Sequence, residues 1–193
     1  KEWLYNYNKD KILDHTQSEI KIESFINDEL IHFSNADTLR SVGSLVDGWK
    51  PSQRKVFYAC VKRNLIKEIR VAQLAGYVSE NAAYHHGEAS LQSTIIGMAQ
   101  NYVGSNNINI LMPNGQFGTR IMGGADSASP RYIHTELNRL MDVIYPVEDM
   151  PLLDYLDDDG MLVEPKYYVP IIPMILVNGC LLYTSPSPRD IGE

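Results

Sequence analysis

The sequence predicts a mainly α-helical fold with a small β component, an α+β class built around a winged helix. Three observations predict this class. Apolar residues recur at helical spacing in several separate stretches. Two of these stretches are joined by a short linker, as in a helix-turn-helix. A strand–turn–strand pattern then follows around Asn114-Gly115, and a helix pair followed by a hairpin makes a winged helix.

The expected helices are amphipathic and are separated by turn signals. A short one is expected within residues 22–30, in a polar, charged connector. After the turn marked by Asp47-Gly48 and Pro51, a helix through residues 56–61 has an apolar stripe and a basic exposed side. Two further helices are expected, from Val71 to about Ser79 and from Gly87-Glu88 to about Tyr102.

The region from Ile108 to Pro146 holds the expected hairpin and a further helix start. Ile108 to Met112 and Gln116 to Met122 are expected to pair as strands around Asn114-Gly115. Ser129 suits an N-cap, and Pro130 suits the first helical position after it. Tyr132 is therefore expected in the first turn of a helix that Pro146 ends.

The expected position of Tyr132 suggests a nucleophile. A helix N-terminus favours phosphate and developing anions, and Arg131 adds a positive neighbour. A phenol is mostly protonated at neutral pH, so positive neighbours would favour the phenolate that attacks a phosphodiester. The alternative that Tyr132 is only an aromatic side chain packing in a helical turn remains open.

The net charge of −7 argues against a nucleic-acid partner until its distribution is considered. Residues 50–70 hold seven basic side chains opposed only by Glu68, whereas residues 136–164 are acidic apart from Arg139. Two ordinary solvated faces would give the same pattern. The two cysteines indicate no disulfide framework and no cysteine-based zinc site. No apolar run reaches the roughly 18 residues that a membrane span needs, so no membrane partner is expected.

Three other clusters are candidates for binding. Adjacent His85 and His86 point in different directions, so a shared metal site is not expected, but one could contact a phosphate or assist proton transfer. Lys50, Arg54 and Lys55 could clamp a backbone phosphate. Surface histidines and solvated charges are the alternatives. The acidic run 157–159 lacks the spacing of a calcium loop and is expected to be a solvated turn.

Taken together and in order, these motifs resemble the DNA-cleavage core of the type IIA DNA topoisomerases, of the eukaryotic-type (topoisomerase II) or large-virus branch rather than bacterial gyrase. The resemblance extends from about Phe25 to Gly179. Its motifs are Ser44–Lys55, Val71–Gly76, Tyr84–Glu88, Asn101–Asn107 with Gly115–Arg120, Asp126–Ile133 and Val163–Gly179.

The resemblance implies a mechanism and a set of site residues. Tyr132 would form a transient 5′-phosphotyrosyl bond with double-stranded DNA, one on each strand in a homodimer, while a second duplex passes through the break. Arg131 would stabilise the scissile phosphate. The resemblance also implies Mg²⁺, ATP and a nuclear parent protein, with the Mg²⁺ and ATP sites outside this chain. The implied DNA contacts are Lys50, Arg54, Lys55, His85, His86, Gln116, Arg120 and Ser129.

The same resemblance divides the chain into four parts. Residues 1–32 are expected to connect to an upstream TOPRIM domain, and residues 33–146 to form the winged-helix cleavage domain. Residues 147–179 would begin an α/β tower domain. Residues 180–193 match no family pattern and are expected to be a non-native tail, so the family's DNA-bending isoleucine is missing. Ala125 also replaces a common family lysine.

Other functions remain open. The chain could be a non-catalytic winged-helix DNA-binding paralogue or a truncated product, and as a fragment it is expected to be inactive alone. A cleavage-only enzyme of the meiotic type is less favoured, because the segment from Gly115 to Tyr132 follows the topoisomerase pattern closely.

Overall fold

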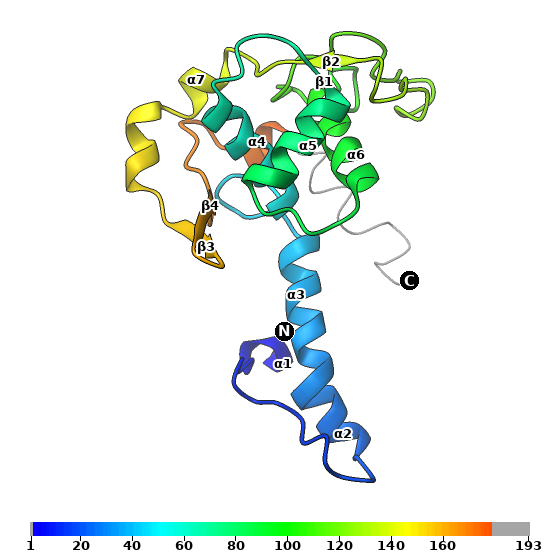
Figure 1. Ribbon diagram of the computed structural model, residues 1–193, viewed down its shortest axis with the longest axis vertical. Helices are drawn as coiled ribbons and strands as arrows, with labels where there is room; N and C mark the ends of the chain where they lie inside the picture. Colours follow the sequence, from blue (N-terminus) through cyan, green and yellow to red (C-terminus); the bar gives the residue numbers. More distant parts are fainter. Residues whose placement is uncertain (1, 179–193) are drawn as a thin grey trace. The chain divides into compact units, whose positions relative to one another are not determined.

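The computed structural model describes residues 2–178, which divide between Val42 and Gly43 into two units (Figure 1). The first unit holds α1 (Glu2–Tyr5), α2 (Ile22–Phe25), the π-helical η1 (Ile26–Leu30) and α3 (Ile31–Ser41). The helix expected within residues 22–30 is thus the beginning of a longer helical run. The polar segment that precedes it packs on this run, because Trp3 Nε1 donates to Asn27 Oδ1 at 3.0 Å.

The second unit is centred on α4 (Pro51–Arg63), α5 (Val71–Asn81) and α6 (Glu88–Ala99), which pack on one another. All three match helices expected from apolar periodicity, with ends shifted by a few residues. Pro51 begins α4, as its fixed φ allows. The Gln53 side chain accepts the Lys50 N–H at 2.9 Å, and Asn64 ends the helix in a left-handed conformation at φ 51°.

The core of the second unit is an apolar cluster beneath these helices. Four aromatic rings lie at its centre, with ring centroids 4.8–5.9 Å apart. Such rings bury large areas and gain from their edge-to-face contacts. The four rings are those of Trp49, Phe57, Tyr145 and Tyr168.

Two short strands and a third extended segment form a ladder beside the helices. β1 (Ile69–Arg70) pairs antiparallel with β2 (His134–Thr135). The other edge of β2 pairs with residues 110–114, where Met112 N donates to Glu136 O at 2.8 Å. The hairpin expected between residues 108–112 and 116–122 is therefore wrong: the partner of the first segment lies beyond an intervening loop.

The helix expected from Ser129 to Pro146 is also wrong, apart from α7 (Met141–Ile144). Residues 129–132 form a turn, and the chain then runs extended through β2. The expected helical face relied on Ile133, Leu137 and Met141. A spacing of four also places residues on one side of a strand, since strand side chains alternate with a period of two. The pattern therefore did not distinguish the two structures.

The last described segment contains the 3₁₀ turn η2 (Val147–Leu152), the hairpin of β3 (Tyr155–Asp158) and β4 (Met161–Pro165), and α8 (Met174–Val177). Asp159 and Gly160 connect the strands with φ values of +50° and +84°. Two positive φ values in a two-residue connection are typical of a tight hairpin turn. The acidic run is thus the turn of a hairpin, which lies at a different edge of the helices from β1 and β2 (Figure 1).

A buried ion pair connects the beginning of α4 to the chain after β4. Arg54 Nε donates to Asp47 Oδ2 at 2.8 Å, and both side chains are more than 90% buried. The same Asp47 oxygen accepts the Tyr168 N–H at 3.0 Å, and the other accepts the Trp49 N–H at 2.9 Å. Such a charge is tolerable only when it is fully paired.

We expect Asp47→Asn to destabilise the second unit by about 3–5 kcal/mol, because it leaves the Arg54 charge buried and unpaired. Urea unfolding measures the change. Lys166→Met is the control, since the Lys166–Asp154 pair at 3.0 Å is exposed and should contribute at most about 1 kcal/mol. Equal losses in the two variants would contradict the assignment of Asp47 as the central contact.

Candidate active site

Residues 115–133 form one long loop between the paired segments 110–114 and 134–138. The loop is closed on itself rather than open. Thr119 donates to Asp126 from both its backbone N–H and its hydroxyl, each at 2.8 Å. Nearer its ends, the Ala128 N–H donates to Gln116 O at 2.9 Å. These contacts give the tip of the loop, around Arg120, a defined shape.

Two glycines make this closure possible. A Cβ on Gly118 would lie 2.5 Å from Gly124 Cα, and Gly118 has a φ of +100°. A Cβ on Gly124 would meet the side-chain ends of Gln100 and Tyr102. Only a residue without a side chain fits where two backbones approach so closely.

The loop is also tied to the end of α6. Gln100 Nε2 donates to Phe117 O at 2.9 Å, and Tyr102 Oη donates to Gln100 Oε1 at 3.3 Å. Phe117 itself is buried in the core. One side of the loop is therefore attached to the helical scaffold, whereas Ile121 at its tip is 93% exposed.

The turn that carries Tyr132 is bonded to the beginning of α5. Val71 N–H donates to Ile133 O and Ala72 N–H donates to Pro130 O, both at 3.1 Å. These N–H groups at a helix N-terminus would otherwise lack partners. The Tyr132 side chain is 75% exposed. A helix N-terminus is thus adjacent to Tyr132, but it belongs to α5 and its first N–H groups fix the turn instead of facing solvent.

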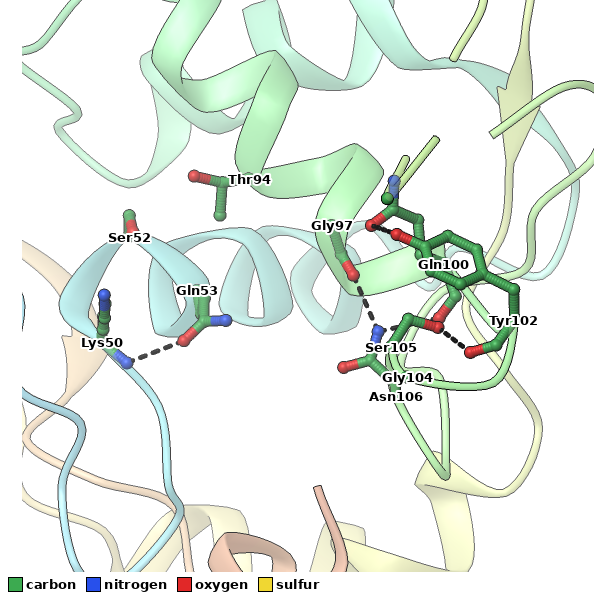
Figure 2. A pocket seen from close by; sticks show the side chains of 11 residues that line it. Lys50, Ser52, Gln53, Thr94, Gly97, Gln100, Tyr102, Gly104, Ser105 and Asn106 are labelled. Atoms are coloured by element: carbon green, nitrogen blue, oxygen red, sulfur yellow. Dashed lines mark hydrogen bonds between the residues drawn. The ribbon is translucent and has the colours of Figure 1, made fainter. Parts of the chain in front are cut away.

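The other candidate residues of the loop are exposed or partly exposed: Arg131, Ser129, Gln116 and Arg120. His85 and His86 are exposed in the segment before α6. Lys50 is half-buried and borders a polar hollow of about 410 Å³. Figure 2 shows this hollow between the beginning of α4 and the end of α6, with Thr94, Gln100 and Asn106 on its other sides. Gly123 of the loop also lines it, so Lys50 and the loop border one space.

Arg54 and Lys55 lie elsewhere than expected. Arg54 is buried and bonded to Asp47. Lys55 Nζ donates to Ala82 O at 2.6 Å and to Glu164 Oε2 at 2.9 Å, with Glu164 98% buried. Both cations therefore neutralise interior carboxylates. Their positions argue against the expected phosphate clamp, and the correction has one physical reason: the two carboxylates were not recognisable as partners in the sequence.

The described residues offer no alternative nucleophile or metal centre of the usual kinds. Within residues 2–178, no group of three His, Cys, Asp or Glu side chains is placed to hold a metal ion. Burial raises the pKa of the Cys60 thiol to about 12, so it remains protonated at neutral pH. None of the helices formed by these residues combines the length and apolar character that a membrane crossing requires.

Comparison with known proteins agrees with this architecture. Residues 40–181 match the family of the A-type subunit of DNA gyrase/topoisomerase IV, and residues 1–38 match the C-terminal associated domain of TOPRIM. The crystal structure of the Plasmodium falciparum topoisomerase II DNA-binding, cleavage and re-ligation domain superimposes with a TM-score of 0.81. It is 53% identical, over 91% of this chain and 24% of that one.

The chain thus belongs to the DNA gyrase/topoisomerase IV family, the class that carries the DNA-cleavage part of type IIA topoisomerases. Within this class it is similar to the eukaryotic enzymes. It is 59% identical to DNA topoisomerase 2 of Saccharomyces cerevisiae over 179 residues and 56% identical to that of Arabidopsis thaliana. These matches cover 93% of the chain but only 12% of each relative.

The structure adds residues that the sequence did not single out. Asp126 closes the loop, Gln100 attaches it to α6, and Asp158 bonds to His85. Asp126 had a signal, because it lies in the motif that ends at Tyr132. Asp158 had none, because its partner lies 73 residues earlier and the acidic run resembled any solvated turn.

We expect Gly118→Ala to open the loop, because the added Cβ collides with backbone atoms of Gly124 that cannot move separately. Gly123→Ala is the matched control: it also has a positive φ, of +57°, but no atom lies within 4 Å of the added Cβ. Limited trypsin digestion should cleave after Arg120 several-fold faster in Gly118→Ala. Similar cleavage rates in both variants would show that the close approach does not hold the loop shut.

We expect the Thr119–Asp126 contact to persist from neutral pH down to about pH 4 and to weaken below it. The Thr119 backbone hydrogen bond lowers the pKa of the Asp126 carboxyl. A lowered pKa means that the contact stabilises the loop above the unfolded-state value and is lost as the pH falls through the folded-state value. Hydrogen exchange of the Thr119 amide measures this, with Asp126→Asn as the comparison. A loss of protection already at pH 6 would contradict it.

Proposed function

We propose that this chain is the DNA-cleaving segment of a type II DNA topoisomerase, and that Tyr132 is its nucleophile. The observation that carries the proposal is the position of Tyr132: an exposed phenol on a turn whose backbone is fixed by α5 and β2. A nucleophile has to be accessible to a large substrate and still be held in place. The S. cerevisiae and A. thaliana relatives are both DNA topoisomerase 2, which supports the same reaction.

The proposed cleavage step is a transesterification. The Tyr132 oxygen loses its proton and attacks a DNA phosphorus atom, forming a phosphotyrosyl bond to the 5′ end. The bond from phosphorus to the 3′ oxygen breaks, and that oxygen leaves as a 3′ hydroxyl after gaining a proton. The reverse attack reseals the strand. Because one phosphoester replaces another, resealing needs no separate energy source.

The residues around Tyr132 have proposed roles that follow from charge and exposure. Arg131 is adjacent and exposed, so it can stabilise negative charge on the attacked phosphate. The remaining proposed DNA contacts are positions whose side chains are at least partly exposed or border the polar hollow. Arg54 and Lys55 are left out because interior carboxylates occupy them. The proposed contacts are Lys50, His85, His86, Gln116, Arg120 and Ser129.

The remaining features of the proposed parent protein lie outside the described residues. Mg²⁺ would neutralise charge on the phosphate, but the described side chains do not form a site for it, so no step here is assigned to it. ATP binding and a homodimer, with one Tyr132 for each strand, are proposed on the same basis, as is action on double-stranded DNA in the nucleus. They rest on similarity to proteins that this chain covers only in small part.

We expect a covalent protein–DNA complex that depends on Tyr132. Residues 1–178 would replace the matching segment of the S. cerevisiae relative, to which the chain is 59% identical. Denaturant would then trap complexes formed with supercoiled DNA, Mg²⁺ and ATP. Tyr132→Phe should abolish attachment to DNA 5′ ends, because it removes the attacking oxygen and little else. Tyr167→Phe, at a second exposed tyrosine, should leave attachment unchanged.

Three outcomes separate the hypotheses. Attachment by the parent and Tyr167→Phe alone establishes the nucleophile and the reaction class together. Attachment by all forms would show that another residue is the nucleophile. DNA binding without attachment by any form would favour a non-catalytic DNA-binding protein.

A further inference from the structure

The segment Ala82–Gly87, between α5 and α6, carries both exposed histidines and has no regular secondary structure. Ala83 has a φ of +45°, which is unfavourable for a residue with a side chain. Such a backbone persists only where its surroundings hold it. The contacts that hold this segment therefore decide where His85 and His86 point.

The first of these contacts comes from a buried ion pair. Lys55 Nζ donates to Ala82 O at 2.6 Å and to Glu164 Oε2 at 2.9 Å. Glu164 lies on β4 and is 98% buried. Removing Glu164 would leave the Lys55 charge without its partner in a largely buried place, so the three groups hold one another.

The second contact comes from the neighbouring strand of the same hairpin. His85 Nε2 lies 3.0 Å from Asp158 Oδ2, and Asp158 is on β3. The His86 ring is held differently, edge-on against Tyr84 with centroids 5.4 Å apart. The β3–β4 hairpin thus contacts the histidine segment at its beginning through Lys55 and at its middle through Asp158.

The Asp158 contact determines which side of the His85 ring faces outward. With Nε2 bonded to a carboxylate, Nδ1 is on the other side of the ring, and no partner among residues 2–178 bonds to it. The His85 side chain is 74% exposed. A histidine fixed by a carboxylate through one nitrogen presents the other in a defined direction, as at metal sites and in catalytic triads.

We propose that Asp158 is a positioning residue, which holds His85 so that Nδ1 donates to a DNA backbone phosphate, and that the β3–β4 hairpin is the support for this contact. The inference rests on the proposed function, because DNA is the ligand. It goes beyond it by giving a role to a hairpin that contains none of the proposed DNA contacts.

The sign of the effect separates positioning from simple electrostatics. A carboxylate near DNA repels phosphate, so removing one should tighten binding if charge were the only factor. Positioning predicts the opposite, because His85 without its partner samples many orientations and loses the ordered contact. Asp154 provides the matched control: it is an exposed carboxylate in the same segment, paired with Lys166 at 3.0 Å and not with a histidine.

The test measures binding of the full 193-residue chain to a fluorescein-labelled duplex of about three helical turns at low salt, by fluorescence anisotropy. Asp158→Ala should weaken binding about two- to fivefold, the range of an exposed charged contact, whereas Asp154→Ala should leave it unchanged or tighter. Asp158→Asn should stay within about twofold of the parent, because its amide oxygen can still accept from Nε2. In a His85→Ala background, Asp158→Ala should have no further effect. Urea unfolding checks that each variant is folded.

Unchanged or tighter binding in Asp158→Ala would overturn the inference, as would an equal loss in the His85→Ala background. An equal loss in Asp158→Asn would show that charge, not orientation, matters, and would also overturn it. Absence of DNA binding by the parent chain would remove the proposed contact. The covalent-complex experiment with Tyr132→Phe does not depend on Asp158, so failure here and failure of the proposed reaction remain distinguishable.

Discussion

The second unit depends on one buried carboxylate. Asp47 accepts hydrogen bonds from Trp49, Arg54 and Tyr168, and so brings together the turn before α4, the helix itself and the chain that follows β4. A buried charge is tolerated only while all of its partners stay in place. These three segments consequently cannot shift independently, and the four aromatic rings that pack around them share this constraint.

The chemistry is placed outside this rigid centre. The loop that carries Tyr132 begins and ends in paired backbone, is closed by Asp126 and is attached to α6 through Gln100. The histidine segment is likewise held by contacts from β3 and β4. Functional side chains are thus exposed on irregular backbone, while regular elements determine their positions, as is common for binding sites on loops.

Local patterns predicted the helical part of this architecture, and distant pairings were beyond them. The helices α4, α5 and α6 follow from apolar spacing within about a dozen residues each. The burial of Lys55 depends on Glu164, which lies 109 residues further along the chain. The partner of residues 110–114 lies beyond a loop with no strand signal of its own. At Ile133 and Leu137 a spacing of four fitted both a helix and a strand, so only the tertiary pairing could decide. The tail expected at residues 180–193 lies outside the described residues.

The central position of β2 has a mechanical consequence. In the proposed reaction Tyr132 holds a DNA end, so a pull on that DNA enters the chain two residues before β2. From there the load passes to backbone hydrogen bonds on two flanks, toward β1 on one side and residues 110–114 on the other. Bonds on both sides of one strand share tension, whereas a terminal strand would peel away one bond at a time. The place where the chain is bonded to its substrate is thus also a place where it resists being pulled apart.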